Sequence, residues 1–346
     1  MNKEFIWIPD EDQIYTEKYG TQGIPPIHSF NKNLGFDFKM DAGKNTLTLG
    51  ANDTNSNIYW PNKSPIELKE AYKAENTDKI LGETINISSG NLIILGSEEK
   101  PVNFHLNSET FNKYRIKLQN SSSFSIKNSS IVRISGPINT AIPTLEESTV
   151  AMSGKSQLII ETVEKIESII SLSCHFFITE SSQTSLTSHH VDIIDGSNII
   201  LQDNAQMLIS SQVLNIRTDL DEKGYPLFDT NFTLKAGATL LNLNSLDGIH
   251  FPLDIHREDY PKGVFNFIAE GEENTGKVVI DVAPKDANAY GLNTMLRNNF
   301  TAINGTVVET GDQMRYFDFS YGKDTRNGNQ VGTITISLRN PHLKLS

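Results

Sequence analysis

Short apolar stretches alternate with clusters of turn-forming residues through the middle of the chain. Between about Phe104 and Leu243, pieces of three to six residues with β-branched or aromatic centres are bounded by Ser, Asn, Thr, Asp and Gly. Examples are SFSIKN (123–128), SQLIIET (156–162) and SNIILQD (197–203). This pattern is typical of short β-strands joined by tight turns.

The apolar pieces recur with a period of about twenty residues. One series steps by 18, 19, 22 and 22 residues through Val132, Val150, Ile169, Val191 and Val213, and a second steps by 18 and 23 through Leu158, Phe176 and Ile199. Two offset series of this kind predict a parallel β-solenoid in which each turn contributes two or three short strands. A β-sandwich would need Asn-Gly or Asp-Gly hairpins between the pieces, and these are scarce.

Other patterns flank the predicted solenoid. Residues 1–63 hold both tryptophans in Gly-, Pro- and Asn-rich sequence, so we expect an irregular N-terminal segment there. SPIELKEAYKAE (64–75) begins with a Ser N-cap and a Pro at the first helical position, which predicts a capping helix within 64–80. Longer strands with Asn-Gly turns predict a C-terminal β cap over 263–346, which leaves 81–262 for the parallel coils.

Three longer connections interrupt the period and are the expected binding surface. They cover 136–148, 219–231 and 252–263. Aromatic rings in such loops can stack on sugar rings, although they also pin loops to the scaffold. The candidate ligand-binding residues are Tyr225, Phe228, Phe251, Tyr260, His189 and His190.

Two parts of the sequence resemble known families. GVFNFIAEGEENTGKVVIDVAP (263–284) with the closing GTITISL (332–338) resembles the hairpin cap that ends passenger domains of bacterial autotransporter adhesins. The central repeats are similar to the right-handed parallel β-helices of the pectin-lyase-like superfamily, which includes phage tailspikes. The resemblance covers about 80–340 and rests on periodicity. It implies an all-β fold: a right-handed parallel β-helix with a short N-terminal capping helix and a C-terminal antiparallel hairpin cap.

One segment carries the best candidate chemistry. HHVDIIDGSNIILQDN (189–204) resembles a coil of the pectin hydrolases, which implies Asp192, Asp195 and Asp203 as catalytic residues of a carbohydrate-active enzyme. A glycosidase needs two carboxylates about 5 to 9.5 Å apart. The segment has no Asp-Asp pair and no Gly-His-Gly, and the Arg-Ile-Lys at 115–117 precedes the acids. As an alternative, Asp195 and Asp203 are turn residues and the histidines are corner residues.

Charge and cysteine content exclude several functions. Lys and Arg total 30 against 42 Asp and Glu, a net charge of -12, and no basic patch offers a nucleic-acid partner. The single Cys174 cannot form an intramolecular disulfide, and we expect it to be a small buried residue. His175 should point to the opposite face of the strand. Neither calcium-loop spacing nor His-x-x-x-His occurs, so no metal and no cofactor is predicted.

The first twenty residues have no uninterrupted apolar core, and no window reaches about eighteen apolar residues. We therefore expect no membrane insertion. We expect a secreted, surface or particle-associated location that is reached without a conventional signal peptide.

These observations favour a bacterial or phage-derived, adhesin-like binding protein that recognises a glycan or a protein on a cell surface through loops on a β-helix. The alternative from another class is an enzyme, either a polysaccharide lyase or a glycoside hydrolase. A third hypothesis is a trimeric tailspike component, and the sequence leaves open whether the chain forms a homo-oligomer. The fold alone does not decide among them.

Overall fold

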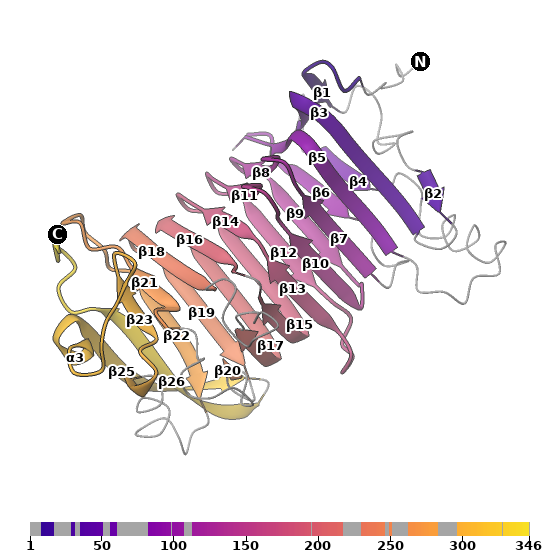
Figure 1. Cartoon of the computed structure of the whole chain (residues 1–346). Coiled ribbons are helices and arrows are strands. Elements are labelled where there is room, and N and C mark those ends of the chain that lie inside the picture. The colour runs from indigo at the N-terminus through magenta and orange to yellow at the C-terminus, as the bar shows by residue number, and fades with distance from the viewer. Residues whose placement is uncertain are drawn as a thin grey trace, which may run out of the picture. The chain divides into compact units, whose positions relative to one another are not determined.

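The computed structural model describes residues 8–16, 29–31, 35–50, 56–60, 82–97, 99–106, 113–194, 196–216, 230–245, 249–250, 262–282, 296–326 and 328–345. The chain divides into two compact units, Met1–Ser171 and Leu172–Ser346. In each unit the described elements are almost all β-strands that pair mostly in parallel (Figure 1). The all-β prediction is confirmed, and the pairing is consistent with a solenoid.

Unit 1 contains twelve described strands and the start of a thirteenth. They are β1 (Gln13–Tyr15), β2 (Ser29–Asn31), β3 (Gly35–Gly50), β4 (Ser56–Trp60), β5 (Gly82–Leu95), β6 (Val102–Leu106), β7 (Lys113–Leu118), β8 (Ser123–Lys127), β9 (Ile131–Ser135), β10 (Asn139–Pro143), β11 (Thr149–Met152), β12 (Gln157–Glu161) and β13 (Ile169–Ser173).

The strands of unit 1 form three stacks of parallel neighbours. The first half of β5 pairs with β7, which pairs with β10, while the second half of β5 pairs with β8, which pairs with β11. A third stack contains β4, β6, β9 and β12. Each turn of the chain therefore contributes three strand segments, within the predicted two or three. Alternate residues are fully buried: Ile85 and Ile116 in one stack, and Phe104 and Val132 in another.

The predicted twenty-residue series is wrong in unit 1. Val132 pairs with Phe104 and with Leu158, whereas Val150 pairs with Phe124 in another stack. Ser122 and Ser148 in neighbouring turns contact each other across 26 residues, which is the length of this turn of the coil. Because buried apolar residues occur in all three segments of a turn, a step of about twenty residues leads from one stack to another.

Unit 2 begins within β13 and contains the remaining described elements. They are β14 (His175–Ile178), β15 (Gln183–Ile193), β16 (Asn198–Asp203), β17 (Gln206–Ile216), β18 (Asn231–Gly237), β19 (Leu240–Ser245), β20 (Ile249–His250), β21 (Phe265–Phe267), β22 (Lys277–Val282), β23 (Thr301–Ile303), β24 (Thr306–Val307), α3 (Gln313–Tyr316), β25 (Phe317–Arg326) and β26 (Asn329–Leu338).

The core of unit 2 is built from large side chains that repeat at the same register. Phe176 pairs with Ile199, as predicted, and the same row continues through Phe232 to Phe265. The rings of Phe232 and Phe265 are stacked with centroids 6.2 Å apart. In contrast, Val191 pairs with Leu214 and not with Val213. Offset aromatic contacts of this kind add to the free energy gained by burial.

Parallel pairing continues beyond Gly263, further than the sequence indicates. β21 pairs in parallel with β18 and β23, and β22 pairs in parallel with β19. Antiparallel pairing joins β23 to β24, β22 to β26 and β26 to β25. The Asn-Gly signal is confirmed, because Asn304 and Gly305 connect β23 to β24 with φ angles of 51° and 77°. A two-residue turn with both φ angles positive matches the twist of a hairpin.

Two segments that were expected to be irregular contain strands, and one expected helix lies outside the described residues. The described part of residues 1–63 is not irregular, because it contains β1 to β4, and β3 pairs in parallel with β5 over most of its length. The expected loop at 136–148 contains β10, which pairs with β7. The capping helix predicted within 64–80 lies outside the described residues. Among those described, no helix is long and apolar enough to cross a membrane.

Candidate functional site

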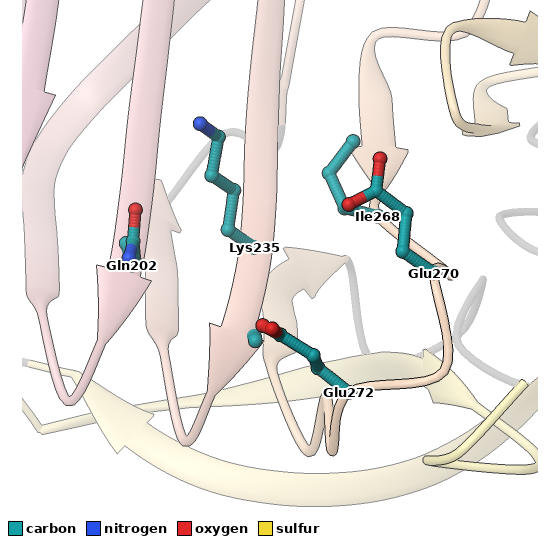
Figure 2. A pocket seen from close by; sticks show the side chains of 6 residues that line it. Gln202, Lys235, Ile268, Glu270 and Glu272 are labelled. Atoms are coloured by element: carbon teal, nitrogen blue, oxygen red, sulfur yellow. The ribbon is translucent and has the colours of Figure 1, made fainter.

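The outer surface of unit 2 carries a depression of about 400 Å³ with a polar lining. We call it the polar depression. It is lined by Gln202, Lys235, Ala236, Ile268, Glu270 and Glu272 (Figure 2).

Strand register places three of these residues side by side. Leu201, Leu234 and Phe267 pair across β16, β18 and β21, and all three are fully buried in the core. The next residue in each chain segment faces the opposite side, which puts Gln202, Lys235 and Ile268 on the outer surface. The register of β16 and β18 shifts between Leu201 and Asp203, so Gln202 lies at an irregularity of this pairing. In the sequence these three residues follow one another at intervals of 33 positions. Thr233 and Asn266, which share a hydrogen bond, have the same separation.

The two glutamates project from the connection between β21 and β22, and this connection is held firmly. Asn274, which is 1% exposed, donates from Nδ2 to the carbonyl oxygens of Leu234 and Ile268 at 2.9 and 3.0 Å. Its Oδ1 accepts from Gly276 N at 3.0 Å. Further along, Asn304 Oδ1 accepts from Ala269 N at 2.8 Å. The wall that carries the glutamates is therefore fixed before any ligand arrives.

The C-terminal segment holds the same connection from its other side. Gly271 N donates to Leu343 O at 3.1 Å, and Leu345 N donates to Ala269 O at 3.0 Å. Glu270 and Lys344 form an antiparallel β-bridge through their backbones.

Two residues after Lys235, the pairing of β18 with β16 needs a glycine. Gly237 has a φ of +110° and pairs with Asp203, and a Cβ atom at Gly237 would lie 2.1 Å from the carbonyl oxygen of Asp203. Asp203 itself has a φ of 63°, and its Oδ2 accepts from Glu180 N at 3.2 Å. In this structure Asp203 is the last residue of β16, and its carboxylate accepts a hydrogen bond from the backbone of the preceding coil.

The charged groups of the polar depression are free to bind a ligand. Within the part of the chain that the structure describes, the side chains of Lys235, Glu270 and Glu272 make no hydrogen bond or ion pair with protein groups. Figure 2 shows the Lys235 ammonium extending away from Glu272, while the Glu270 carboxylate lies beside Ile268. One ammonium, one amide and two carboxylates thus face a common space next to an apolar side chain.

Three predicted residues, His189, His190 and Asp192, lie on β15, and Asp192 is held by a residue that was not predicted. Asp192 on β15 is in register with Asn215 on β17, and Asn215 Nδ2 donates to Asp192 Oδ1 at 2.6 Å. Asp192 is only 6% exposed. The rings of His189 and His190 meet edge to face with centroids 4.8 Å apart.

Other predicted residues are separated or lie outside the described residues. Asp192 lies in the stack of β15 and β17, whereas Asp203 ends β16 in the stack of β14, β16 and β18. Asp195, Tyr225, Phe228, Phe251 and Tyr260 lie outside the described residues. In the described ranges, no three His, Cys, Asp or Glu side chains are grouped so as to hold a metal ion.

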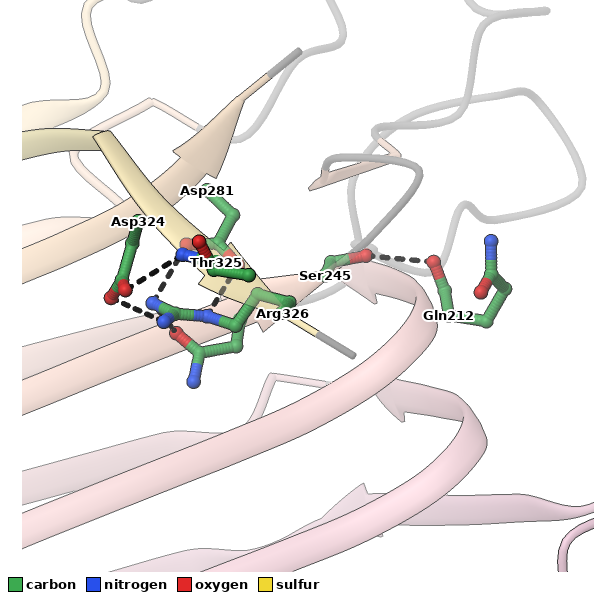
Figure 3. Close-up of polar contacts among 7 residues, drawn as sticks. Gln212, Ser245, Asp281, Asp324, Thr325 and Arg326 are labelled. Atoms are coloured by element: carbon green, nitrogen blue, oxygen red, sulfur yellow. Dashed lines mark hydrogen bonds and ion pairs between the residues drawn. The ribbon is translucent and has the colours of Figure 1, made fainter. Parts of the chain in front are cut away.

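A second polar cluster joins the C-terminal hairpin to the parallel strands of unit 2 (Figure 3). Arg326, the last residue of β25, donates from Nε to Asp281 Oδ2 at 3.2 Å and from Nη2 to Asn244 Oδ1 at 3.1 Å. It also pairs with Asp324. Burial raises the pKa of the Asp281 carboxyl, although Arg326 opposes the rise. The hydrogen bond from Arg326 lowers the pKa of Asp324.

Cys174 is 2% exposed, as predicted, while His175 is exposed on the other face of the strand. Burial raises the pKa of the Cys174 thiol to about 12, so the thiolate that a nucleophile requires is not formed near neutral pH.

Sequence reasoning did not find the polar depression. Its signal is the equal spacing of Gln202, Lys235 and Ile268, which follows a longer period than the one identified. Each residue taken alone looks like an ordinary solvent-facing strand position.

No protein-family model matches the chain, and comparisons with curated proteins and with solved structures gave no match.

Proposed function

We propose that this chain is an adhesin-like recognition protein of bacterial or phage origin, located at a surface or secreted, that binds a glycan in the polar depression of unit 2. In this proposal the parallel coils form a right-handed β-helix of the pectin-lyase-like type. The observation that carries the proposal is the set of charged groups on Lys235, Glu270 and Glu272, which face one depression and have no protein partner among the described residues.

The lining suits sugars chemically. Carboxylates accept hydrogen bonds, an ammonium donates them and an amide does both, which matches the hydroxyl groups of a carbohydrate. Ile268 and the aliphatic part of Lys235 offer apolar surface to the C–H groups of a sugar ring. Because Asn274 and Asn304 fix the glutamate-bearing connection, little ordering is needed on binding.

The arrangement of the lining also suits a polymer. Gln202, Lys235 and Ile268 come from three neighbouring chain segments, and neighbouring strands lie about 4.8 Å apart, a length comparable to one sugar unit. A linear glycan lying across the strands would therefore present successive units to successive coils.

A glycan array on the purified chain tests the proposal, followed by titration of each bound glycan against Lys235→Met. We expect this variant to lose affinity for neutral glycans, because it removes a hydrogen-bond donor of the lining. Lys277→Met is the matched control, because Lys277 is exposed on β22 and does not line the depression. Absence of binding to every glycan, or equal loss in both variants, would count against the proposal.

A second candidate function is glycan cleavage. Glu270 and Glu272 face the same depression, and a pair of carboxylates is what a glycosidase uses as acid and as base or nucleophile. Overnight incubation of each bound glycan should then give new reducing ends or unsaturated products. If products form, Glu270→Gln and Asp192→Asn separate the polar depression from the candidate acid on β15. Binding without products supports recognition alone.

A further inference from the structure

The charges of the polar depression indicate which glycans it takes, an inference that rests on the proposed glycan-binding function. We infer that the polar depression selects glycans whose sugars carry free, positively charged amino groups, and that it disfavours uronic acids. Two carboxylates, from Glu270 and Glu272, face the depression with a single ammonium, from Lys235. The lining therefore carries more negative than positive charge, in a chain whose net charge is -12.

Placement of the lysine leaves the carboxylates available. Lys235 forms no ion pair with either glutamate among the described residues, and Figure 2 shows its ammonium extending away from Glu272. A ligand ammonium can therefore approach Glu270 or Glu272 without displacing a protein cation. Hydrogen bonds between an ammonium and a carboxylate are about twice as strong as those between neutral groups.

Rigidity of the wall strengthens the selection. The connection that carries Glu270 and Glu272 is anchored on one side by Asn274 and on the other by the C-terminal backbone at Leu343 and Leu345. The backbone positions of the two glutamates are thus fixed, so both carboxylates start from the same wall of the depression when a sugar enters. A uronic acid would gain contact with Lys235 alone, while an amino sugar meets two carboxylates.

The outer surface at Gln202 provides a place for the neighbouring sugars. Gln202 lies one strand beyond Lys235 and offers an uncharged donor and acceptor. We therefore assign hydroxyl recognition to the β16 end of the depression and amine recognition to the glutamate end.

Three oligosaccharides of equal length test the inference by calorimetric titration: an oligomer of glucosamine, its fully N-acetylated form and an oligomer of a uronic acid. We expect the glucosamine oligomer to bind about four- to tenfold more tightly than the acetylated form, because each exposed charge pair contributes a factor of about two to three. The uronic acid oligomer should bind most weakly. The preference for the amine should shrink as salt is added, since exposed charges are screened.

Matched variants locate the effect. Glu270→Gln with Glu272→Gln should reduce binding of the glucosamine oligomer to the level of its acetylated form. Glu164→Gln with Glu167→Gln changes the net charge equally at exposed positions in unit 1, and it should leave the preference intact. Circular dichroism of each variant establishes that it is folded.

The outcomes distinguish the two proposals. If all three oligosaccharides bind equally, or the uronic acid binds best, the inference is wrong while glycan binding stands. If the preference survives in the Glu270→Gln, Glu272→Gln variant, the polar depression is not the amine site. If no glycan binds in the array, the proposed function fails first.

Discussion

Arg326 and Asp281 form a two-bonded ion pair in which the carboxylate is almost completely buried. Nε and Nη2 of Arg326 lie 3.2 and 3.3 Å from the two carboxylate oxygens, and the Asp281 side chain is 1% exposed. The pair connects the end of β25 to β22. It therefore fastens the antiparallel hairpin to the parallel strands of unit 2.

Removing the arginine should destabilise the fold. Arg326→Gln leaves the buried Asp281 carboxylate without its partner, and we expect the free energy of unfolding to fall by about 3 kcal/mol or more. Arg339→Gln is the matched control: Arg339 pairs with Asp318 at 2.8 Å, but both side chains are about half exposed. That substitution should cost less than about 1 kcal/mol. Urea denaturation of both variants measures the difference, and equal losses would contradict a special role for the buried pair.

The same carboxylate predicts a pH dependence. Burial raises the native pKa of Asp281, so the folded chain holds this proton more tightly than the unfolded chain does. The stability that Asp281 contributes is present below the ordinary pKa of an aspartate and is lost as the pH rises through the higher native pKa. Asp281→Asn should therefore remove a decline in the free energy of unfolding just above the ordinary aspartate range.

Asp324 should affect stability with the opposite pH dependence. The hydrogen bond from Arg326 lowers its native pKa, so its contribution is present above the ordinary aspartate pKa and lost as the pH falls through the lower native value. Urea denaturation between about pH 3 and pH 7 should give different profiles for Asp281→Asn and Asp324→Asn. Identical profiles would show that the two carboxylates titrate alike.

Cys174 should report unfolding of its surroundings. It is 2% exposed, and burial raises its pKa to about 12, so the native thiol should not react with a water-soluble disulfide reagent near about pH 8. Full reaction is expected once denaturant unfolds unit 2. Rapid labelling of the native chain would show that the strand containing Cys174 opens under native conditions.

A glycine substitution tests the close approach of two coils. Gly237→Ala would place a Cβ atom 2.1 Å from the Asp203 carbonyl oxygen at a φ of +110°, so we expect a loss of about 3 kcal/mol or more. Gly305→Ala is the control, since Gly305 also has a positive φ but no described atom lies within 4 Å of the place that its new methyl group would take. It should lose only about 1–2 kcal/mol in thermal or urea denaturation. Similar losses would mean that backbone conformation, and not contact with Asp203, decides the outcome.

Local pattern predicted the strands and one turn of this fold. Apolar residues such as Phe176 and Ile199 alternate with polar ones because alternate side chains of a strand face the core. The Asn304-Gly305 pair predicted its hairpin because both residues tolerate positive φ. These signals depend only on neighbours in sequence.

Register was not accessible in the same way. Val132 and Val150 belong to different stacks although both are buried, because residues of each stack meet the same apolar core. The polar depression depends on this register, since Gln202 and Lys235 become neighbours only when β16 pairs with β18. Its glutamates also need Asn274, whose buried role in holding the connection has no local sequence signal.

Asn274 links the stability of unit 2 to the geometry of the polar depression. Asn274→Ala would leave the carbonyl oxygens of Leu234 and Ile268 and the N–H of Gly276 without this partner. We expect a loss of about 1–3 kcal/mol in the free energy of unfolding, because buried polar groups without partners carry their desolvation cost. The connection that holds Glu270 and Glu272 should also become less ordered.

Two measurements separate these effects. Urea denaturation reports the loss of stability. Titration with the glycan that binds the wild-type chain reports the loss of affinity, which here must arise indirectly because Asn274 does not line the depression. Asn204→Ala is the control, because Asn204 is exposed and its side chain makes no hydrogen bond within the described residues. If Asn274→Ala is destabilised but binds the glycan as tightly as the wild type, the fixed connection is a requirement of folding and not of recognition.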